Sequence, residues 1–331
     1  MENISFYGLI IILSYLLTFF VRKWAINKSI VDVPNDRSSH TIPTPRGGGI
    51  AIVICWFLGL FYFYFTDKID QHLFLALLSG LPLAIIGILD DIRNLKPGLR
   101  FLVQVLSAGL ALFFLSGLQL LDFGFITIEN QWLLTPIALI AILWAINLFN
   151  FLDGTDGYIS TEVIFISLAY FILFQNNISL ILAFSVFGFL IWNWPKAKIF
   201  MGDVGSTLLG FNIAILAIYF QNEMKVSIVI SLILTSVFWF DATITLLRRI
   251  KNKEKLNQAH RKHAFQRIVQ AGFSHQKTVL WAFVLNVFGL GLALLAAGFT
   301  KWSLLFLLID LILLLIVLRY IDRKKAFEYS K

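Results

Sequence analysis

The 331-residue chain has few charged residues and only one cysteine. Asp, Glu, Lys and Arg make up 14% of it, whereas about 25% is usual in soluble globular proteins. Hydrophobic residues make up 59%, and the mean hydropathy is +0.82. The single cysteine, Cys55, excludes an intramolecular disulfide and any metal site built from several thiolates. These figures exclude a soluble domain and indicate a polytopic membrane protein.

Several familiar signals are also missing from the sequence. No basic region precedes the first apolar segment, and Arg22 and Lys23 follow it, so we expect a retained first span and no cleaved signal peptide. The chain has no Walker-type glycine loop, no GxSxG and no HExxH motif. His72 and His275 are isolated in the sequence, and no role is assigned to them.

Apolar runs of about 20 residues, the length that crosses a bilayer, fill most of the chain. They predict an all-α integral membrane protein with eleven transmembrane helices in a single domain, 1–331. The predicted spans are 4–21, 47–66, 71–89, 100–118, 132–151, 158–174, 178–194, 204–220, 225–246, 277–298 and 302–319.

The basic residues predict the orientation of these spans. All but three of the 27 lysines and arginines fall in one set of loops, and the other side has only Lys68, Lys225 and Lys301. Cytoplasmic loops carry such an excess, so we expect a periplasmic N-terminus and a cytoplasmic C-terminus. The net charge of +8 therefore reflects membrane topology, and nucleic acid is not an expected partner. Most polar motifs fall on the cytoplasmic side, where we expect the site to lie.

The stretch "NLFNFLDGTDGY" (147–158) places four polar residues at the end of an apolar run. Asn147, Asn150, Asp153 and Asp156 follow one another at three-residue spacing. Such steps advance about 300° on a helix, so the four positions drift across a broad face. If Asn147 and Asn150 occupy the last turns, Gly154 and Gly157 let the chain break beneath them, and the side chains are expected to line a concave rim. Amides suit a sugar or a nucleobase, and carboxylates suit a cation or hydroxyls. Helix capping and solvation would explain one or two of the four.

Two further motifs carry carboxylates at span ends. Asp90 and Asp91 offer one ligand for a cation and one base, or else they form a solvated pair with Arg93. In "FMGDVGS" (200–206), Asp203 stands between two glycines at a helix start. It could be an N-cap, but the glycines suggest close approach to a ligand, and a carboxylate suits Mg²⁺.

Two cytoplasmic segments could bind anions. The basic loop 248–267 carries His260 and His263 among lysines and arginines, which suits a diphosphate or, alternatively, anionic headgroups. In "PTPRGGG" (43–49), Arg46 precedes three glycines, which form either a flexible turn or a close approach to an anionic ligand.

In this order on an eleven-span chain, "DD" after a span, "NxxNxxDGxDG", "FMGD" and a late His/Arg loop resemble the polyprenyl-phosphate N-acetylhexosamine-1-phosphate transferases (glycosyltransferase family 4). The resemblance covers nearly the whole chain. It implies that a lipid phosphate attacks the β-phosphorus of a UDP-sugar and that UMP leaves. It also implies Mg²⁺, with Mn²⁺ as the alternative, and undecaprenyl phosphate and a UDP-amino sugar as partners. The implied location is the bacterial inner membrane. The resemblance leaves open whether the protein forms a homodimer.

The resemblance also implies roles for single residues. It makes Asp203 the metal ligand, with Asn150 nearby, Asp90 the base for the lipid phosphate, and Asp91 its partner at the metal. The catalytic set is Asp90, Asp91, Asp153 and Asp156. The substrate-binding set is Arg46, Asn147, Asn193, Phe200, His260, Arg261 and His263. Of these, Asp153, Asp156 and Asn193 would face the uridine, Phe200 would stack on the uracil, and the histidines would meet the diphosphate or sugar.

One departure bears on the substrate. The peptidoglycan translocase of this superfamily has adjacent histidines in its last large loop, whereas this chain reads "AHRKHAFQR". The pattern favours the branch that initiates O-antigen or related glycans, and it leaves open N-acetylglucosamine, N-acetylgalactosamine or a 6-deoxy amino sugar. The peptidoglycan translocase is the alternative. A transporter is a weaker one, because transport sites lie near the midplane and few ionisable residues, such as Asp241 and Asp310, occur within the spans.

Overall fold

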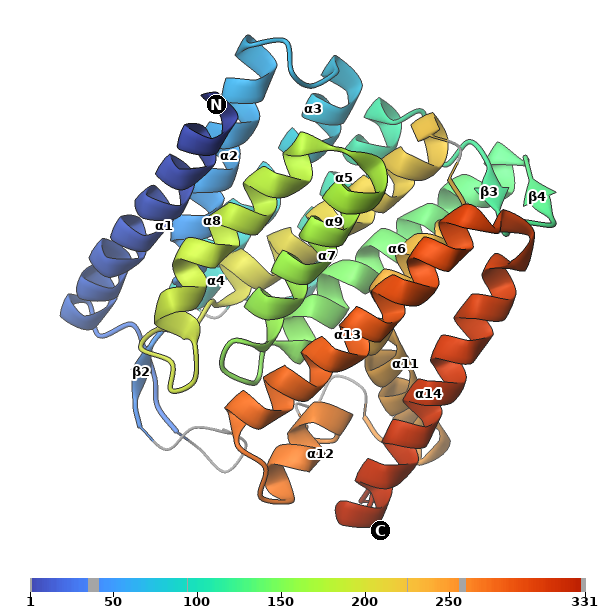
Figure 1. Cartoon of the computed structure of the whole chain (residues 1–331). Coiled ribbons are helices and arrows are strands. Elements are labelled where there is room, and N and C mark those ends of the chain that lie inside the picture. Colours follow the sequence, from blue (N-terminus) through green and yellow to red (C-terminus); the bar gives the residue numbers. More distant parts are fainter. Residues whose placement is uncertain (1, 35–41, 94, 225, 256–259, 329–331) are drawn as a thin grey trace.

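The computed structural model describes all residues except 1, 35–41, 94, 225, 256–259 and 329–331. Long helices run side by side between two ends of the molecule, and the chain termini lie at opposite ends (Figure 1). Parts of two sequence motifs, the segment before Arg46 and the loop before His260, fall outside the described residues.

Helices dominate the described chain, and two antiparallel two-residue strand pairs accompany them. The pairs are β1 (Val31–Asp32) with β2 (Thr44–Pro45), and β3 (Leu121–Asp122) with β4 (Thr127–Ile128). The helices are α1 (Glu2–Asn27), α2 (Gly49–Phe65), α3 (Gln71–Leu78), α4 (Leu81–Arg93), α5 (Pro97–Phe114), α6 (Gln131–Leu152), α7 (Tyr158–Phe174), α8 (Asn177–Asn193), α9 (Asp203–Met224), α10 (Ile228–Leu234), α11 (Ser236–Lys251), α12 (Ala264–Gln270), α13 (His275–Gly298), the 3₁₀ turn η1 (Thr300–Trp302) and α14 (Ser303–Lys324).

Every predicted span overlaps a helix or a helix pair. Two spans are broken, since 71–89 corresponds to α3 and α4 and 225–246 to α10 and α11. Within the described residues, seven segments are long and apolar enough to cross a membrane, or eight if α10 and α11 form one bent span. The apolar helices α2, α7 and α8 are shorter, with 17 residues each. The chain is thus a multi-pass membrane protein, while the count of eleven and its orientation stay predictions.

The helix pair α10 and α11 bends by 79° at Thr235. A bend frees backbone carbonyls, which must find other donors in an apolar environment. Here the Trp239 indole N–H donates to the carbonyl of Leu232 at 2.8 Å, and the Thr235 hydroxyl donates to that of Ser231 at 2.8 Å. The bend is therefore satisfied locally without proline or glycine.

Helix α9 lies at the centre of the bundle. In the most apolar 18-residue stretch of α9, 78% is buried, whereas the corresponding figure for α1 and α14 is 22%. Helix α9 packs against α4 and α6. Small residues allow the close crossing, because a Cβ on Gly210 would come within 2.5 Å of the Ala145 carbonyl oxygen of α6. This central helix begins at Asp203, so the carboxylate of the "FMGD" motif lies on a firmly packed element.

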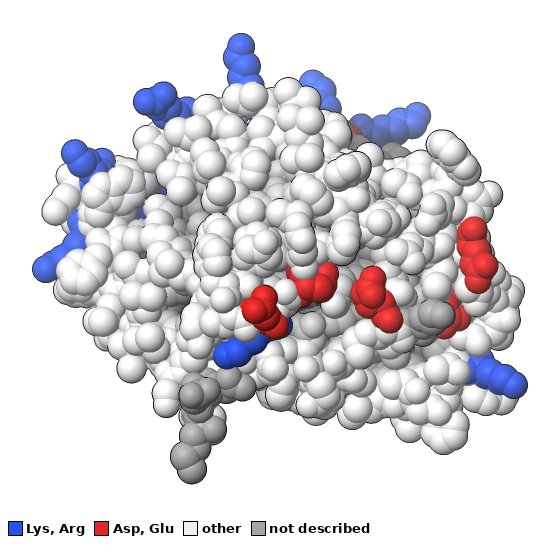
Figure 2. Space-filling model, turned by 90° about the horizontal axis from the view of Figure 1, so that it is seen from above, with Lys and Arg blue, Asp and Glu red and all other residues white. Residues whose placement is uncertain are grey.

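The two ends of the bundle differ in charge. Figure 2 looks down on the end where α3 and the β3–β4 hairpin lie. Most side chains in this view are uncharged, several acidic ones lie across the middle, and most of the basic ones lie towards the edges. The opposite end carries the basic segment around α12 and the C-terminus.

Candidate active site

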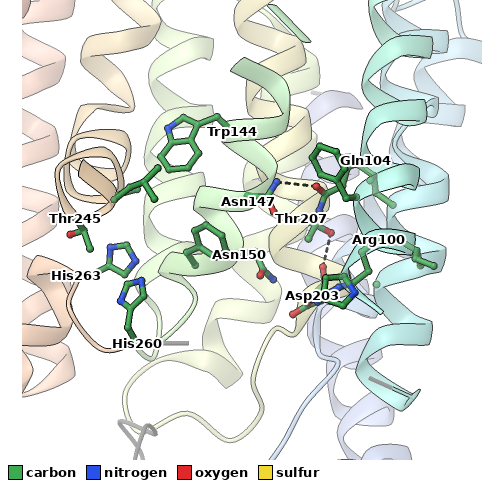
Figure 3. A pocket seen from close by; sticks show the side chains of 18 of the residues that line it. Arg100, Gln104, Trp144, Asn147, Asn150, Asp203, Thr207, Thr245, His260 and His263 are labelled. Atoms are coloured by element: carbon green, nitrogen blue, oxygen red, sulfur yellow. Dashed lines mark hydrogen bonds and ion pairs between the residues drawn. The ribbon is translucent and has the colours of Figure 1, made fainter. Parts of the chain in front are cut away.

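A cavity of about 590 Å³ lies between α4, α5, α6, α9, α11 and the segment 260–263 (Figure 3). Its apolar lining residues include Leu83, Phe101, Trp144, Phe151 and Leu246. Its polar lining residues are Arg100, Gln104, Asn147, Asn150, Asp203, Thr207, Thr245, Arg249, His260 and His263. The cavity can therefore contact both the apolar and the polar groups of an amphiphilic molecule.

Arg100 joins the carboxylates of two motifs that are far apart in the sequence. Its Nη1 lies 2.6 Å from Asp90 Oδ2 and 2.8 Å from Asp203 Oδ2. The Leu95 backbone N–H donates to the other Asp90 oxygen at 2.6 Å. The alternative in which Arg93 holds the acidic pair is wrong, because Arg93 is exposed and Arg100 takes that place. Sequence reasoning missed Arg100, although a cation one turn into the helix after the "DD" motif was a usable signal.

Asp91 faces the start of α9. Its oxygens accept hydrogen bonds from the backbone N–H groups of Asp203 at 3.2 Å and Val204 at 3.4 Å, so it caps the helix in place of Asp203. Arg46 donates to the Asp91 carbonyl at 2.6 Å and lies 3.8 Å from its carboxylate. Buried Asp91 thus fixes the position of Asp203 through the backbone.

The predicted purpose of the glycines beside Asp203 is wrong. A Cβ on Gly202, which has φ +79°, would collide with the Asp91 carboxylate. A Cβ on Gly49 would lie 2.5 Å from the Gly205 backbone. Gly202 and Gly205 therefore allow segments of the chain to pack closely on one another. Gly49, in the "PTPRGGG" motif, also serves this packing, because it lies at the contact between α2 and α9.

The four polar residues of 147–158 divide into two groups. Asn147 and Asn150 line the cavity, where Asn147 donates to Gln104 at 2.9 Å and Asn150 to Ser206 at 3.2 Å. Asp153 and Asp156 follow the end of α6 and are not among the cavity-lining residues. The predicted break of the chain beneath the asparagines is confirmed, since α6 ends at Leu152 and Gly157 has φ +72°. The single concave rim of four side chains is wrong, because only the two asparagines line the cavity.

Asp153 lies in an acidic environment. Burial, together with the negative charges of Asp203, Asp91 and Asp156, raises the pKa of Asp153 well above its ordinary value. Its carboxyl group is thus more easily protonated than a solvated aspartate. Such a group can hold a proton within a cluster of carboxylates.

Asp156 has a partner that sequence reasoning left without a role. His275 Nδ1 lies 3.2 Å from Asp156 Oδ2, and the Ala197 N–H donates to the same oxygen at 3.1 Å. His275 begins α13, far along the chain, so its sequence neighbours gave no signal. His275, isolated in the sequence, thus has a partner in the fold.

The other predicted substrate-binding residues lie around this loop. Buried Asn193 accepts from the Gly157 N–H at 3.0 Å and the Ser160 hydroxyl at 3.1 Å, and donates to the Ile199 carbonyl at 3.1 Å. It therefore connects the segments 154–160 and 193–199. The Phe200 backbone bonds to Pro45 and Gly48, next to Arg46. Arg261 is half-buried and is not among the cavity-lining residues. Their contacts with a nucleotide stay predictions.

A cationic group faces the acidic cluster across the cavity. Arg249 is buried and pairs with Glu254 at 3.2 Å, next to His260 and His263 in the lining. Burial opposes ionisation of Glu254, but hydrogen bonds from Lys262, Asn252 and Arg249 hold its pKa below the ordinary value. The ionised Glu254 thus anchors the segment that carries both histidines.

The donor set at Asp203 fits a divalent cation. In the described chain, no three His, Cys, Asp or Glu side chains gather to hold a metal ion. Mg²⁺ needs only one or two carboxylates, since water and phosphates complete its shell. The Arg100 guanidinium already lies between Asp90 and Asp203, which shows that this pair attracts a cation, and the Asn150 amide hydrogen-bonds Asp203. Asp203 and Asn150, the predicted pair, would hold the metal, and Asp91, which was expected beside it, accepts hydrogen bonds from the start of α9.

Comparison with known proteins connects this geometry to a family. The model described as "Glycosyl transferase family 4" matches residues 73–221. A probable undecaprenyl-phosphate N-acetylglucosaminyl 1-phosphate transferase of Bacillus subtilis is 31% identical over 90% of this chain and 86% of its own length. Undecaprenyl-phosphate alpha-N-acetylglucosaminyl 1-phosphate transferases of Escherichia coli K12 (30% identical, 87% of this chain, 80% of theirs) and Thermotoga maritima (29%, 84% and 87%) are also similar.

Proposed function

The chain belongs to the polyprenyl-phosphate N-acetylhexosamine-1-phosphate transferases of glycosyl transferase family 4, and we propose that it transfers N-acetylglucosamine 1-phosphate from UDP-N-acetylglucosamine to undecaprenyl phosphate. UMP is the second product. The choice of sugar follows the names of the three relatives. The choice of O-antigen or a related surface glycan as the pathway follows the "AHRKHAFQR" pattern. The names of these three relatives do not include the muramoyl-pentapeptide donor of the alternative.

The observation that carries this proposal is the mixed lining of the cavity. Its apolar residues, such as Trp144 and Phe101, suit the first isoprene units of a lipid, and its charged residues include Asp203, Arg100 and Arg249. A water-insoluble lipid phosphate and a water-soluble nucleotide sugar both need partners where they meet. The cavity offers apolar and charged groups within about 590 Å³.

The charged residues align and neutralise the phosphates. Phosphoryl transfer depends mainly on positioning and charge neutralisation, and little on covalent help from the protein. Arg100 and Arg249 attract the phosphate oxygens from two sides, while Asp90 accepts a proton from the lipid phosphate. A bound Mg²⁺ would supply further charge neutralisation at the transferring phosphoryl group. Asn147 and Asn150 offer hydrogen bonds to hydroxyl and amide groups of the donor.

The Asp153–Asp156 loop belongs to the nucleotide end in this proposal. Asp156, held by His275 and the Ala197 N–H, and Asn193 fix the loop next to Phe200. A uracil stacked on Phe200 would then find hydrogen-bond partners on the same loop. The raised pKa of Asp153 gives this end a carboxyl group that can donate a hydrogen bond as well as accept one.

The test is UMP release by the purified protein with Mg²⁺, undecaprenyl phosphate and a panel of UDP-sugars. We expect release with UDP-N-acetylglucosamine that requires both the lipid and the metal, and loss of about 100-fold or more in Asp203→Asn. The panel includes UDP-N-acetylgalactosamine and the UDP-muramoyl pentapeptide. Release from the pentapeptide alone would replace the proposed substrate, and no lipid-dependent release from any donor would overturn the transferase proposal.

A further inference from the structure

The two histidines of the basic loop lie side by side but have different surroundings. Their ring centroids are 4.9 Å apart, and both rings line the cavity (Figure 3). His263 is 4% exposed, whereas His260 is half-buried. Because a neutral imidazole has one donor and one acceptor nitrogen, the partner of each Nδ1 decides what each ring presents to the cavity.

The partner of His260 is a backbone N–H group. The N–H of Lys262 donates to His260 Nδ1 at 3.2 Å. A backbone N–H can only donate, so this nitrogen carries no proton and the neutral ring is protonated at Nε2. Burial, together with His263 and Arg249, lowers the pKa of His260 to about 3. His260 thus stays neutral at physiological pH, with Nε2–H as a donor.

The buried Nδ1 of His263 faces a carboxylate instead. It lies 3.7 Å from Asp241 Oδ1, slightly beyond hydrogen-bond length, and such contacts are often long before substrate binds. Asp241 also accepts from the N–H groups of Ala264 at 2.8 Å and Phe265 at 3.4 Å, and from Thr245 Oγ1 at 3.1 Å. A carboxylate only accepts, so it favours a proton on the nitrogen that faces it. It competes with the backbone N–H of Gln266, which points at the His263 side chain in the capping box of α12 and favours the other tautomer.

The identity of residue 241 supports this interpretation. The start of α12 needs an acceptor, but asparagine, serine or threonine caps a helix about as well as aspartate. A buried carboxylate is costly unless it is paired, and Asp241 is 6% exposed. The need to cap α12 therefore explains why residue 241 has a hydrogen-bond acceptor. The neighbouring imidazole of His263 explains why that acceptor is a charged carboxylate.

We propose that Asp241 is a positioning residue that keeps the proton of His263 on Nδ1, so that His263 and His260 present opposite tautomers to the cavity. Nε2 of His263 then accepts a hydrogen bond, while Nε2–H of His260 donates one. A diphosphate sugar offers both a phosphate oxygen for the donor and a hydroxyl group for the acceptor. The catalytic consequence rests on the proposed transferase function, but the tautomers do not.

The tautomers are measured directly by ¹⁵N NMR of the full chain labelled at its five histidines, at pH 7 in detergent or nanodiscs. His260→Gln and His263→Gln spectra assign the two signals. We expect protonation of His260 at Nε2 and of His263 at Nδ1. A His263 signal protonated at Nε2, with Nδ1 accepting from the nearby Gln266 backbone, would overturn the proposal.

Asp241→Asn tests the consequence for catalysis. The amide oxygen, in the place of Oδ2, can still accept from the Phe265 N–H, while the NH₂ group, in the place of Oδ1, would donate to His263 Nδ1 at the expense of the Ala264 bond and move the histidine proton to Nε2. We expect the NMR signal to switch, kcat to fall by about tenfold or more, and KM for the UDP-sugar to change little. Asp241→Glu, which restores the charge, should recover part of kcat. An unchanged kcat in a variant whose tautomer has switched would overturn the positioning role.

Asp70→Asn is the matched control. Asp70 accepts from the Leu73 N–H at 2.9 Å and caps α3 at the other end of the bundle, so the change removes a capping carboxylate without touching the cavity. Its kcat should equal that of the wild type. If the wild type releases no UMP at all, the proposed function fails, and the NMR result still decides the tautomers.

Discussion

Two carboxylates that share one guanidinium are the central residue-level feature of the cavity. Asp90 and Asp203 come from α4 and α9, and Arg100 of α5 contacts both within 2.8 Å. A single positive charge cannot neutralise two negative ones, so the group keeps a net charge of −1. Partly buried ion pairs add little to stability, because desolvation offsets most of their attraction. The arrangement therefore makes more sense as a cation and phosphate site than as a structural clamp.

We predict that Arg100→Gln lowers kcat by about 10- to 100-fold with a folded protein, because the cavity loses a phosphate-binding cation. The same change should lower the Mg²⁺ concentration needed for half-maximal rate, because Asp90 and Asp203 lose a competing cation. A Mg²⁺ titration of UMP release measures both effects. The control is Arg93→Gln, which removes an exposed arginine from the end of α4. Equal rates in the two variants would contradict the role of Arg100.

His260 predicts a pH effect on stability. Burial lowers the pKa of His260 to about 3 from its ordinary 6.5, so below pH 6.5 the unfolded chain binds a proton that the folded chain refuses. This contribution to stability is present above pH 6.5 and is lost as the pH falls towards 3. As the pH is lowered from 6.5 to 4.5, we expect the Tm of His260→Gln to fall by less than the Tm of the wild type. Parallel Tm curves for the two proteins, measured in detergent, would contradict the lowered pKa.

At the scale of elements, the packing of α9 against α6 depends on a glycine. Gly210 lies inside α9, and a Cβ there would lie 2.5 Å from the Ala145 carbonyl oxygen. Gly109 lies inside α5 with nothing within 4 Å of its Cβ position. We predict that Gly210→Ala destabilises by about 1–3 kcal/mol through overpacking, while Gly109→Ala is neutral or stabilises by about 0.5–1 kcal/mol through helix propensity. Thermal unfolding of both variants tests the pair, and an equal shift in both would refute the close crossing.

The helices were predictable from hydropathy because burial in lipid demands long apolar runs. One of the two breaks within them was not. The bend at Thr235 lacks proline and glycine and depends on Trp239 and Thr235 hydrogen bonds, which a hydropathy pattern does not contain. The break between α3 and α4 is different, because Gly80 and Pro82 stand there in the sequence, and the Gly80 Cβ position is filled by Leu208 and Phe211 of α9. Only the bend at Thr235 depends on contacts that the local pattern does not encode.

The candidate site was predictable to the extent that its residues stand in short motifs. Asp90, Asn150 and Asp203 meet because three span ends lie at the same side of the bundle. Arg100 and His275 stand alone in the sequence, and only the fold brings them to Asp90 and Asp156. Conversely, Gly202 and Gly205 looked like ligand-binding glycines because packing contacts between distant segments are invisible in the sequence.

For the whole molecule, the asymmetry between its ends determines what it can do. The charged and imidazole groups that line the cavity are Arg100, Asp203, Arg249, His260 and His263, and all of them belong to loops or span ends that the basic residues assign to the cytoplasm. A nucleotide sugar is made and kept in the cytoplasm, so a site on the other face would receive no donor. The proposed reaction therefore requires the orientation that the lysines and arginines predict.

Cysteine labelling tests this orientation directly. Lys68 and Lys253 are both exposed, and they fall on opposite sides of the predicted topology. The native Cys55 is buried and free, so it gives little background. We predict that Lys68→Cys reacts with a membrane-impermeant maleimide on spheroplasts, whereas Lys253→Cys reacts only after lysis. The reverse pattern would place the cavity on the outer face, where it could not meet a cytoplasmic UDP-sugar, and the proposed function would fall with the topology. Labelling of both cysteines on intact spheroplasts would instead mean that the two positions lie on the same side of the membrane, separated by an even number of crossings.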